Sequence, residues 1–320
     1  MRTLITTAGR VDDVSSSSLK AHFEACASEG FWLDIEAPDD SDLELLTEVL
    51  GFHHLTVEDI QHQNQRPKLE EFPGHVFVVL FVAEQSQDEL LMREHHLYVS
   101  TDYLVSVHQE PAPALDQLRA RLDARPELTR GKTGFLGYLV IDSLVDALFP
   151  ILDQIDEEVD TAEDYVLVSP SPQDLVRITA LKHQVTDLRR VLGPQRDLFQ
   201  RLVTYALTAD DQELSIHYRD VYDHMVRLYE NVDALRDLLS GVMDIYLSTV
   251  SNRLNSTVKT LTVIASLFLP LSFLTGFYGM NFTYLTQVLE IPHWTFWVGV
   301  ATMVAATALQ LIFFRRRGWI

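Results

Sequence analysis

The chain has very little cysteine and few basic residues. Cys26 is the only cysteine among 320 residues, so no disulfide can form within the chain, which indicates a reducing compartment. Only 25 Lys and Arg stand against 46 Asp and Glu, giving a formal net charge of −21. This balance argues against nucleic acid as a partner. An acidic surface either keeps a large domain in solution or concentrates cations, and charge alone leaves both interpretations open.

The motifs of common enzymes are missing as well. A Gly-Lys-Thr run at 131–133 resembles the end of a nucleotide-binding loop, but Pro126 occupies the position of the first glycine. The histidine pairs at 53–54 and 95–96 lack the cysteines or the Glu-x-x-His pattern of a zinc enzyme. No nucleophile elbow, redox cysteine pair or dinucleotide fingerprint occurs. The sequence therefore predicts that the protein is not an enzyme.

Charge is absent from two long stretches near the C-terminus. No charged side chain occurs from Leu261 to Leu289, and from Ile291 to Phe314 only His293 can titrate. Each stretch exceeds the roughly 20 residues that cross a hydrocarbon core of about 30 Å. We therefore expect two transmembrane helices in contact with lipid, at 257–278 and 294–314.

Basic residues flank these stretches on one side only. Arg253 and Lys259 precede the first stretch, residues 315–317 are all arginine, and the connecting loop contains neither Lys nor Arg. The positive-inside rule then places both termini in the cytoplasm. The first 20 residues are too polar for a signal peptide. We expect a multi-pass protein of a cell membrane, the plasma membrane of a bacterium.

The rest of the chain predicts an α/β domain followed by long helices. Short β-rich runs bounded by turn signals are typical of strands. They lie at 31–35, 76–83, 90–99 and 103–107, with helical patterns at 40–50, 56–61, 114–125, 134–168 and 173–206. The expected segments are an α/β domain at 1–130, antiparallel helices at 131–212, a stalk helix at 213–256, an extracytoplasmic loop at 279–293 and a basic tail at 315–320.

One uninterrupted helix is predicted over 213–278, about 100 Å long. Its first half carries apolar residues at steps of three and four, which we call the apolar stripe. The stripe consists of Tyr218, Val221, Met225, Leu228, Val232, Leu235, Leu239, Val242 and Tyr246. Such a heptad pattern is typical of a packed helix face. The pattern fits packing on preceding helices of the same chain or a coiled coil between copies.

The same spacing continues into the first expected span with smaller side chains, which we call the small-residue face. It consists of Asn255, Val258, Thr262, Ala265, Leu269, Ser272, Gly276 and Gly279. Small residues on one face normally indicate close helix packing. Alternatively the face lines a pore, in which Val258 and Leu269 would be apolar constrictions and Asn255 an amide ring. One two-span chain cannot enclose a conduit, so a pore requires a symmetric ring of copies.

Gly279-Met280-Asn281 directly follows the first expected span, which places a polar amide at a membrane mouth. Mg²⁺ gives up its water reluctantly, and a ring of amide oxygens can accept hydrogen bonds from the waters of the hydrated ion. A ring of carboxylates would bind the ion too tightly to release it. We therefore expect these three residues to form a selectivity filter. The plainer alternative is a helix-capping asparagine.

In these features the chain resembles the CorA family of divalent-cation channels. In that family a Gly-Met-Asn signature lies outside the first of two C-terminal spans, and a basic tail closes the chain. The runs at 64–68, 219–224 and 246–252 also look like family sequence, so the resemblance covers nearly the whole chain. It implies a funnel-shaped homopentamer with a cytoplasmic α/β domain and a pore lined by the first span. It also implies that Leu261 lines this pore.

The resemblance implies passive uptake of Mg²⁺, with Co²⁺ or Ni²⁺ as further cargo, driven by the membrane potential. It also implies regulatory Mg²⁺ ions that bridge carboxylates of neighbouring cytoplasmic domains and hold the channel shut. Asp220 matches a family carboxylate, and Glu84 is its expected partner by an alignment through Phe81. The chain departs from the family pattern after the signature, where Glu290 is the only acid in the loop.

Two other functions stay open at this point. One is a zinc transporter of the same superfamily, with or without proton coupling. The other is a membrane-anchored sensor or scaffold that conducts nothing.

Overall fold

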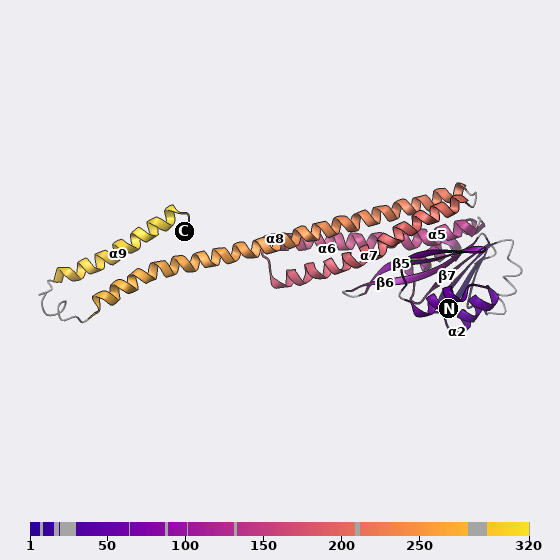
Figure 1. Ribbon diagram of the computed structural model, residues 1–320, viewed down its shortest axis with the longest axis horizontal. Coiled ribbons are helices and arrows are strands. Elements are labelled where there is room, and N and C mark those ends of the chain that lie inside the picture. The colour runs from indigo at the N-terminus through magenta and orange to yellow at the C-terminus, as the bar shows by residue number, and fades with distance from the viewer. Residues whose placement is uncertain are drawn as a thin grey trace. The chain divides into compact units, whose positions relative to one another are not determined.

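The computed structural model describes residues 1–6, 9–15, 19, 30–63, 65–86, 89–100, 102–130, 133–208, 212–280 and 293–319. The chain divides into two compact units. Unit 1 comprises Met1–Tyr165 and Ser171–Met243, and unit 2 comprises Val166–Pro170 and Asp244–Ile320. Unit 1 holds a sheet and the helices around it, and unit 2 holds the second half of the longest helix together with the C-terminal helix (Figure 1).

A seven-stranded sheet forms the centre of unit 1 (Figure 1). Its strands are β1 (Arg2–Thr6), β2 (Gly9–Asp12), β3 (Phe31–Glu36), β4 (Lys68–Phe72), β5 (His75–Ser86), β6 (Glu89–Val99) and β7 (Tyr103–His108). The spatial order is β2-β1-β3-β7-β6-β5-β4, and all neighbours are antiparallel except β3 and β7. The four predicted strands are confirmed as β3, β5, β6 and β7. Strands β1, β2 and β4 were not predicted: β2 and β4 are short and rich in charged residues, whereas β1 carries a β-rich run at 3–6 that was missed.

One face of the sheet carries the apolar core. Successive strand residues point to opposite faces, and Phe31, Leu33 and Ile35 of β3 all join this core. Three short helices close it: α2 (Asp40–Glu44), the π-helix η1 (Leu45–Val49) and α3 (His54–His62). The predicted helix at 40–50 is thus an α-helical turn followed by a π-helical one.

The other face of the sheet buries a polar network around Asp34. Its carboxylate accepts hydrogen bonds from Ser106, from His108 and from Arg119 of α4 (Pro113–Ala124). Burial opposes ionisation, but the hydrogen bonds from His108 and Ser106 and the charge of Arg119 outweigh it and lower the pKa of Asp34. A paired, buried carboxylate of this kind fixes the position of α4 on the sheet.

Long helices make up the remainder of the described chain. After the 3₁₀-helix η2 (Pro126–Arg130) they are α5 (Thr133–Asp146), α6 (Phe149–Val168), α7 (Pro172–Thr208), α8 (Gln212–Tyr278) and α9 (His293–Arg316). The predicted helical pattern over 134–168 is confirmed, with turns at 147 and 148 that divide it into α5 and α6. The prediction of one helix from about residue 213 to Tyr278 is confirmed by α8, which has 67 residues.

The apolar stripe of α8 is buried within this chain. Its nine side chains are at most 8% exposed, and five of them are at 0%. The hydroxyl of Tyr218 donates to the Gly134 carbonyl of α5, and Arg189 of α7 pairs with Asp233 of α8 at 2.5 Å. These contacts favour packing on preceding helices of the same chain over a coiled coil between copies.

Among the residues that the structure describes, three helical stretches are long and apolar enough to cross a membrane, judged by length and composition: Gly134–Val168, Glu213–Phe277 and Trp297–Arg316. Half of the apolar window of the first is buried inside the fold, compared with 6% in each of the other two. An apolar helix that lies in a protein core needs no lipid around it. The burial therefore favours the second half of α8 and α9 as spans, and the two-span organisation stays a prediction.

Among the described residues of unit 2, two recorded side-chain hydrogen bonds join α8 to α9 and to the turn that follows α9. Lys259 Nζ donates to the Gly318 carbonyl at 2.8 Å, and Gln310 Nε2 donates to the Ser266 carbonyl at 3.1 Å. As the position on α8 rises from 259 to 266, the partner residue falls from 318, in the turn after α9, to 310 on α9. The two helices therefore pack as an antiparallel hairpin.

A Schellman motif ends α9. The amides of Gly318 and Trp319 donate to the carbonyls of Arg315 and Phe314, at 3.2 and 2.9 Å. Gly318 has a φ of +66°, which favours glycine at this position. The rings of Phe314 and Trp319 stack with centroids 5.7 Å apart, which is the apolar contact that accompanies this motif.

Candidate functional site: a helix face and an acidic cluster

The small-residue face of α8 points away from α9. Its eight side chains, and that of Leu261, are all exposed in the chain. The buried or half-buried side chains of the same stretch are Lys259, Val263, Ser266, Leu267, Pro270, Leu271 and Leu274. Close packing of the small residues on α9 is therefore not observed in the described chain. The face is open to other copies of the chain or to an ion path.

Large apolar side chains alternate with oxygen-bearing ones on and beside this face. Leu269 is 75% exposed, Leu261 66% and Val258 52%, although apolar groups of this size normally find cover. The Thr262 hydroxyl donates to the Val258 carbonyl at 2.8 Å, within its own helix. The exposed leucines are where apolar constrictions were expected, and their role in a pore stays a prediction.

The end of α8 accounts for the glycine of the signature. The Gly279 amide donates to the Thr275 carbonyl at 2.9 Å, and the Met280 amide donates to Phe277 at 3.3 Å. A Cβ at position 279 would lie 3.1 Å from the Thr275 oxygen, so a larger residue would disturb this tight exit from the helix. Asn281 and Glu290 lie outside the described residues. The filter at 279–281 and the role of Glu290 stay predictions.

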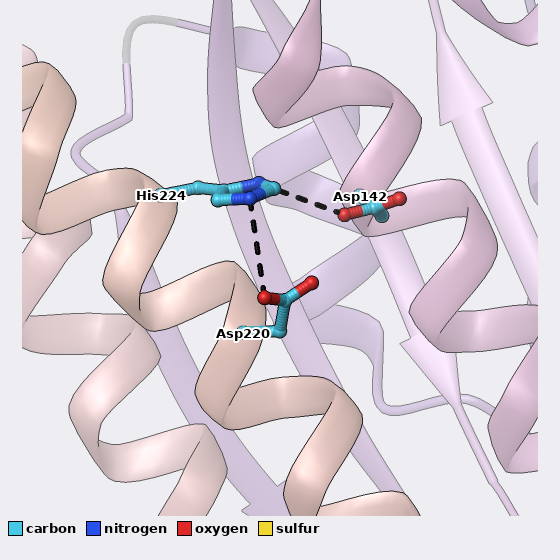
Figure 2. Close-up of side chains that lie close together, drawn as sticks. All are labelled: Asp142, Asp220 and His224. Carbon is cyan, nitrogen blue, oxygen red and sulfur yellow. Dashed lines mark ion pairs between the residues drawn. The ribbon is translucent and has the colours of Figure 1, made fainter.

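A second group of candidate side chains gathers in unit 1 between α5 and α8. Asp142 of α5 faces Asp220 and His224 of α8 (Figure 2). The latter two are four residues apart and so share one helix face. His224 Nδ1 lies 3.9 Å from Asp142 Oδ1, and His224 Nε2 lies 4.0 Å from Asp220 Oδ1. Asp146, one turn after Asp142, approaches His224 Nδ1 to 3.2 Å. We call these four residues the acidic cluster.

Electrostatics within the acidic cluster favour binding of a cation. Burial and the charges of Asp146 and Asp220 together raise the pKa of Asp142 to about 6, against the opposing effect of His224. Asp142 Oδ1 and His224 Nδ1 are buried without a hydrogen-bond partner. Asp146 Oδ1 already lies 3.2 Å from His224 Nδ1, and a bound cation would give Asp142 Oδ1 a partner and screen the repulsion between the carboxylates.

The dimensions of the acidic cluster fit a divalent ion. One ligand atom each from Asp142, Asp220 and His224 lie within 4.8 Å of one another. Opposite ligands of Mg²⁺ are about 4.2 Å apart, because each bond is about 2.1 Å long, and Mg²⁺ usually keeps several waters. The carboxylates suit Mg²⁺, whereas the imidazole also suits Co²⁺, Ni²⁺ or Zn²⁺.

Glu84 lies elsewhere in the chain and is already paired. Its Oε2 accepts a hydrogen bond from Arg93 Nε at 2.8 Å, and Arg93 also bonds Glu110 at 3.1 Å. The structure brings Asp220 together with Asp142 and His224 and not with Glu84. Because the expected bridge joins neighbouring copies, the pairing of Glu84 with Asp220 stays a prediction.

The sequence analysis missed Asp142 and His224 as candidate ligands. His224 belongs to the family-like run at 219–224 but was not singled out. Asp142 and Asp146 are acids four residues apart in an otherwise apolar stretch, Phe-Leu-Gly-Tyr-Leu-Val-Ile-Asp-Ser-Leu-Val-Asp. Acids at helical spacing on an apolar helix are the signal that could have identified them.

Comparison with known proteins covers almost the whole chain. Residues 28–316 match the family described as CorA-like Mg²⁺ transporter protein. The cobalt/magnesium transport protein CorA of Thermotoga maritima is 33% identical over 293 residues, which cover 90% of this chain and 83% of that protein. The putative metal ion transporter YfjQ of Bacillus subtilis is 30% identical over 291 residues, covering 90% of this chain and 89% of that protein.

A solved structure agrees at the level of the fold. The complete CorA magnesium transporter of Methanocaldococcus jannaschii matches with a TM-score of 0.84 at 22% identity, covering 100% of this chain and 99% of that one. The resemblance inferred from the Gly-Met-Asn signature and its setting is thereby confirmed. The chain belongs to the CorA-like Mg²⁺ transporter family.

Proposed function

We propose that this chain forms a passive Mg²⁺ uptake channel in which several copies, five by the family resemblance, arrange α8 around a common axis. The observation that carries the proposal is the exposure of the small-residue face while the opposite side of α8 packs on α9. A ring of copies would turn that face inward and leave α9 toward lipid. The printed names of the relatives, cobalt/magnesium and metal ion transporters, support divalent cations as the cargo.

In the proposed pore, a hydrated ion first meets the amide oxygens of Asn281 and then passes the apolar level of Leu269. Further in, the face offers the Thr262 hydroxyl and the Asn255 amide, separated by Val258. Apolar rings of this kind close a pore by expelling water, whereas the oxygen-bearing positions tolerate a hydrated ion. The membrane potential contributes about 4.6 kcal/mol per 100 mV for a divalent cation, which suffices to drive uptake.

Regulation is proposed to act through the acidic cluster. A divalent ion bound by Asp142, Asp220 and His224 screens the carboxylates and, with Glu84 of a neighbouring copy, holds adjacent copies together in the closed state. When cytosolic Mg²⁺ falls, the ion leaves and the carboxylates repel one another. The buried Asp142 Oδ1, which has no hydrogen-bond partner, supports this role.

Ion flux into proteoliposomes tests the transport proposal directly. Purified protein should pass Mg²⁺, and Co²⁺ and Ni²⁺ should be compared with Zn²⁺ in the same vesicles. Asn281→Ala should abolish Mg²⁺ selectivity, whereas Gln287→Ala, which removes another amide of the same loop, should have little effect. Preference for Zn²⁺ would instead indicate a zinc transporter, and no flux of any ion would indicate a sensor or scaffold.

Reversing one charge tests the regulatory proposal. Asp220→Lys should leave the channel conducting at millimolar internal Mg²⁺, because the lysine repels the closing ion. Asp223→Lys is the matched control, since it makes the same charge change on an exposed part of α8 outside the acidic cluster. If Asp220→Lys closes like the parent, or both variants open equally, the cluster is not the sensor.

A further inference from the structure

Proline interrupts the hydrogen bonding of α8 inside its apolar half. In an α-helix the amide of residue 270 would donate to the carbonyl of residue 266. Pro270 has no N–H, so it cannot donate to the Ser266 carbonyl. In water such a carbonyl would be solvated, but in a hydrocarbon core it needs a partner from the protein.

Gln310 of α9 supplies that partner. Its side-chain Nε2 donates to the Ser266 carbonyl at 3.1 Å, and both residues are half-buried in the hairpin. The stretch from Trp297 to Phe314 contains no other amide side chain. A polar amide in an apolar span is costly unless it is bonded, so the pairing satisfies a donor and an acceptor at once.

Other polar side chains of α9 behave differently. The hydroxyls of Thr302 and Thr307 donate to carbonyls of α9 itself, Gly299 at 2.8 Å and Met303 at 3.0 Å. In the described part of α9, Gln310 is thus the polar side chain whose recorded hydrogen bond reaches α8, and its target is the carbonyl left free by Pro270.

We propose that Gln310 is a positioning residue that replaces the hydrogen bond missing at Pro270 and thereby fixes the orientation of α8. Together with the bond between Lys259 and Gly318, it attaches α9 to one side of α8 at two points two helical turns apart. Such an attachment resists rotation of α8 about its own axis. Leu269, next to Pro270 and 75% exposed, is the side chain whose direction is held.

The hydrogen bond itself needs no assumption about transport, whereas its effect on the channel rests on the proposed function. For that reason the test has two readouts. The first is the equilibrium constant of unfolding of the full chain, measured by titration with SDS in mixed micelles. The second is the Mg²⁺ concentration that half-closes the channel in proteoliposomes.

A double-mutant cycle between positions 310 and 270 isolates the proposed bond. Gln310→Met keeps the length of the side chain and removes its donor. It should change the unfolding constant about 3- to 15-fold, the range measured for hydrogen bonds between membrane helices. Pro270→Ala restores an N–H that can donate to the Ser266 carbonyl. In that background Gln310→Met should change the unfolding constant less than twofold.

The control is Thr307→Val, because that hydroxyl bonds only within α9 in the contacts recorded for it. Its effect should be the same with Pro270 and with Ala at position 270. If Gln310→Met does not fold alone but folds with Pro270→Ala, the proposal is supported. Equal effects of Gln310→Met in both backgrounds would overturn it, since the side chain would then act through packing.

The two readouts separate this proposal from the proposed function. Absence of Mg²⁺ flux in the parent protein would contradict the proposed channel function, but it would not affect the test of the hydrogen bond by the unfolding cycle. Coupling in the unfolding cycle with an unchanged Mg²⁺ response would overturn the positioning role and leave only a structural bond. A shift of the half-closing concentration of about 3- to 15-fold that disappears with Pro270→Ala supports both.

Discussion

The two halves of α8 repeat the same spacing and have opposite burial. In the first half, the apolar stripe is at most 8% exposed and lies against helices of its own chain. In the second half, every position of the small-residue face is exposed, although α9 packs along the same stretch. Spacing therefore identifies a helix face, but it does not identify what covers that face.

The chemistry of the residues distinguishes the two halves. The apolar stripe consists of Leu, Val, Met and Tyr, whose large side chains interlock with a neighbouring helix. The small-residue face mixes amide, hydroxyl and glycine positions with isolated valine and leucine. Such a mixture gains little from burial in one chain, and it suits a surface that meets its own copies and water.

Truncating one leucine in each half should give the largest contrast. Leu228 is 0% exposed and Leu269 is 75% exposed. Leu228→Ala should lower the free energy of unfolding by about 2–5 kcal/mol, because it leaves a cavity. Leu269→Ala should cost less than about 1 kcal/mol and should act on ion flux instead. Thermal unfolding followed by circular dichroism measures the first effect. Equal losses at both positions would show that the second half is packed after all.

A smaller contrast concerns pH, because only the first half of α8 carries part of the acidic cluster. The pKa of Asp142 is raised to about 6, so the proton must leave before a cation binds. The apparent affinity of the protein for Mg²⁺ should therefore fall about tenfold between pH 7 and pH 5, and the stabilisation by Mg²⁺ should weaken with it. Melting temperatures with and without Mg²⁺ at each pH measure this change.

The same group has the opposite effect on the metal-free protein. Since folding raises the pKa of Asp142 above its usual value, the stabilising contribution of its protonated form is complete below about pH 4. It is lost as the pH rises through 6. Asp142→Asn should remove both pH effects, whereas Asp153→Asn, at an exposed acid of α6, should leave them unchanged.

The smallest expected effects come from two glycines in unit 2. Gly318→Ala should destabilise the end of α9 by about 1 kcal/mol, because position 318 has a φ of +66°. Gly276→Ala should be neutral or stabilising, since its backbone is helical and nothing lies within 4 Å of the added Cβ. Hydrogen exchange of the flanking amides measures both changes. Destabilisation at 276 would contradict the open surroundings of that position.

Much of the fold followed from local patterns. The central strands and the bounds of α7 and α8 were predictable because long apolar periodicities mark them. The break between α5 and α6 at 147–148 was missed, although Pro150 stands two residues after it and proline is favoured in the first turn of a helix. Strands β2 and β4 depend on neighbours supplied by the tertiary structure, which a local pattern does not contain, whereas the β-rich run of β1 could have been found.

The candidate sites also divide into residues that the local sequence reveals and residues that depend on tertiary packing. Gly279 and the small-residue face were found from spacing and from their place beside an uncharged stretch. Asp142 has a sequence signal of its own, an acid at helical spacing in an apolar stretch, but its closeness to Asp220 depends on the packing of α5 on α8. Gln310 was missed, because a single glutamine has no meaning until the carbonyl opposite it is known.

The hydrogen bond of Thr262 has a consequence for the sign of charge that the proposed pore admits. Its only proton is committed to the Val258 carbonyl, so the side that faces outward from the helix presents lone pairs alone. Repeated around an axis, such hydroxyls would form a collar of negative partial charge. This ring would accept hydrogen bonds from the water molecules of a hydrated metal ion and would repel chloride. It contains no carboxylate that would bind the passing ion too tightly.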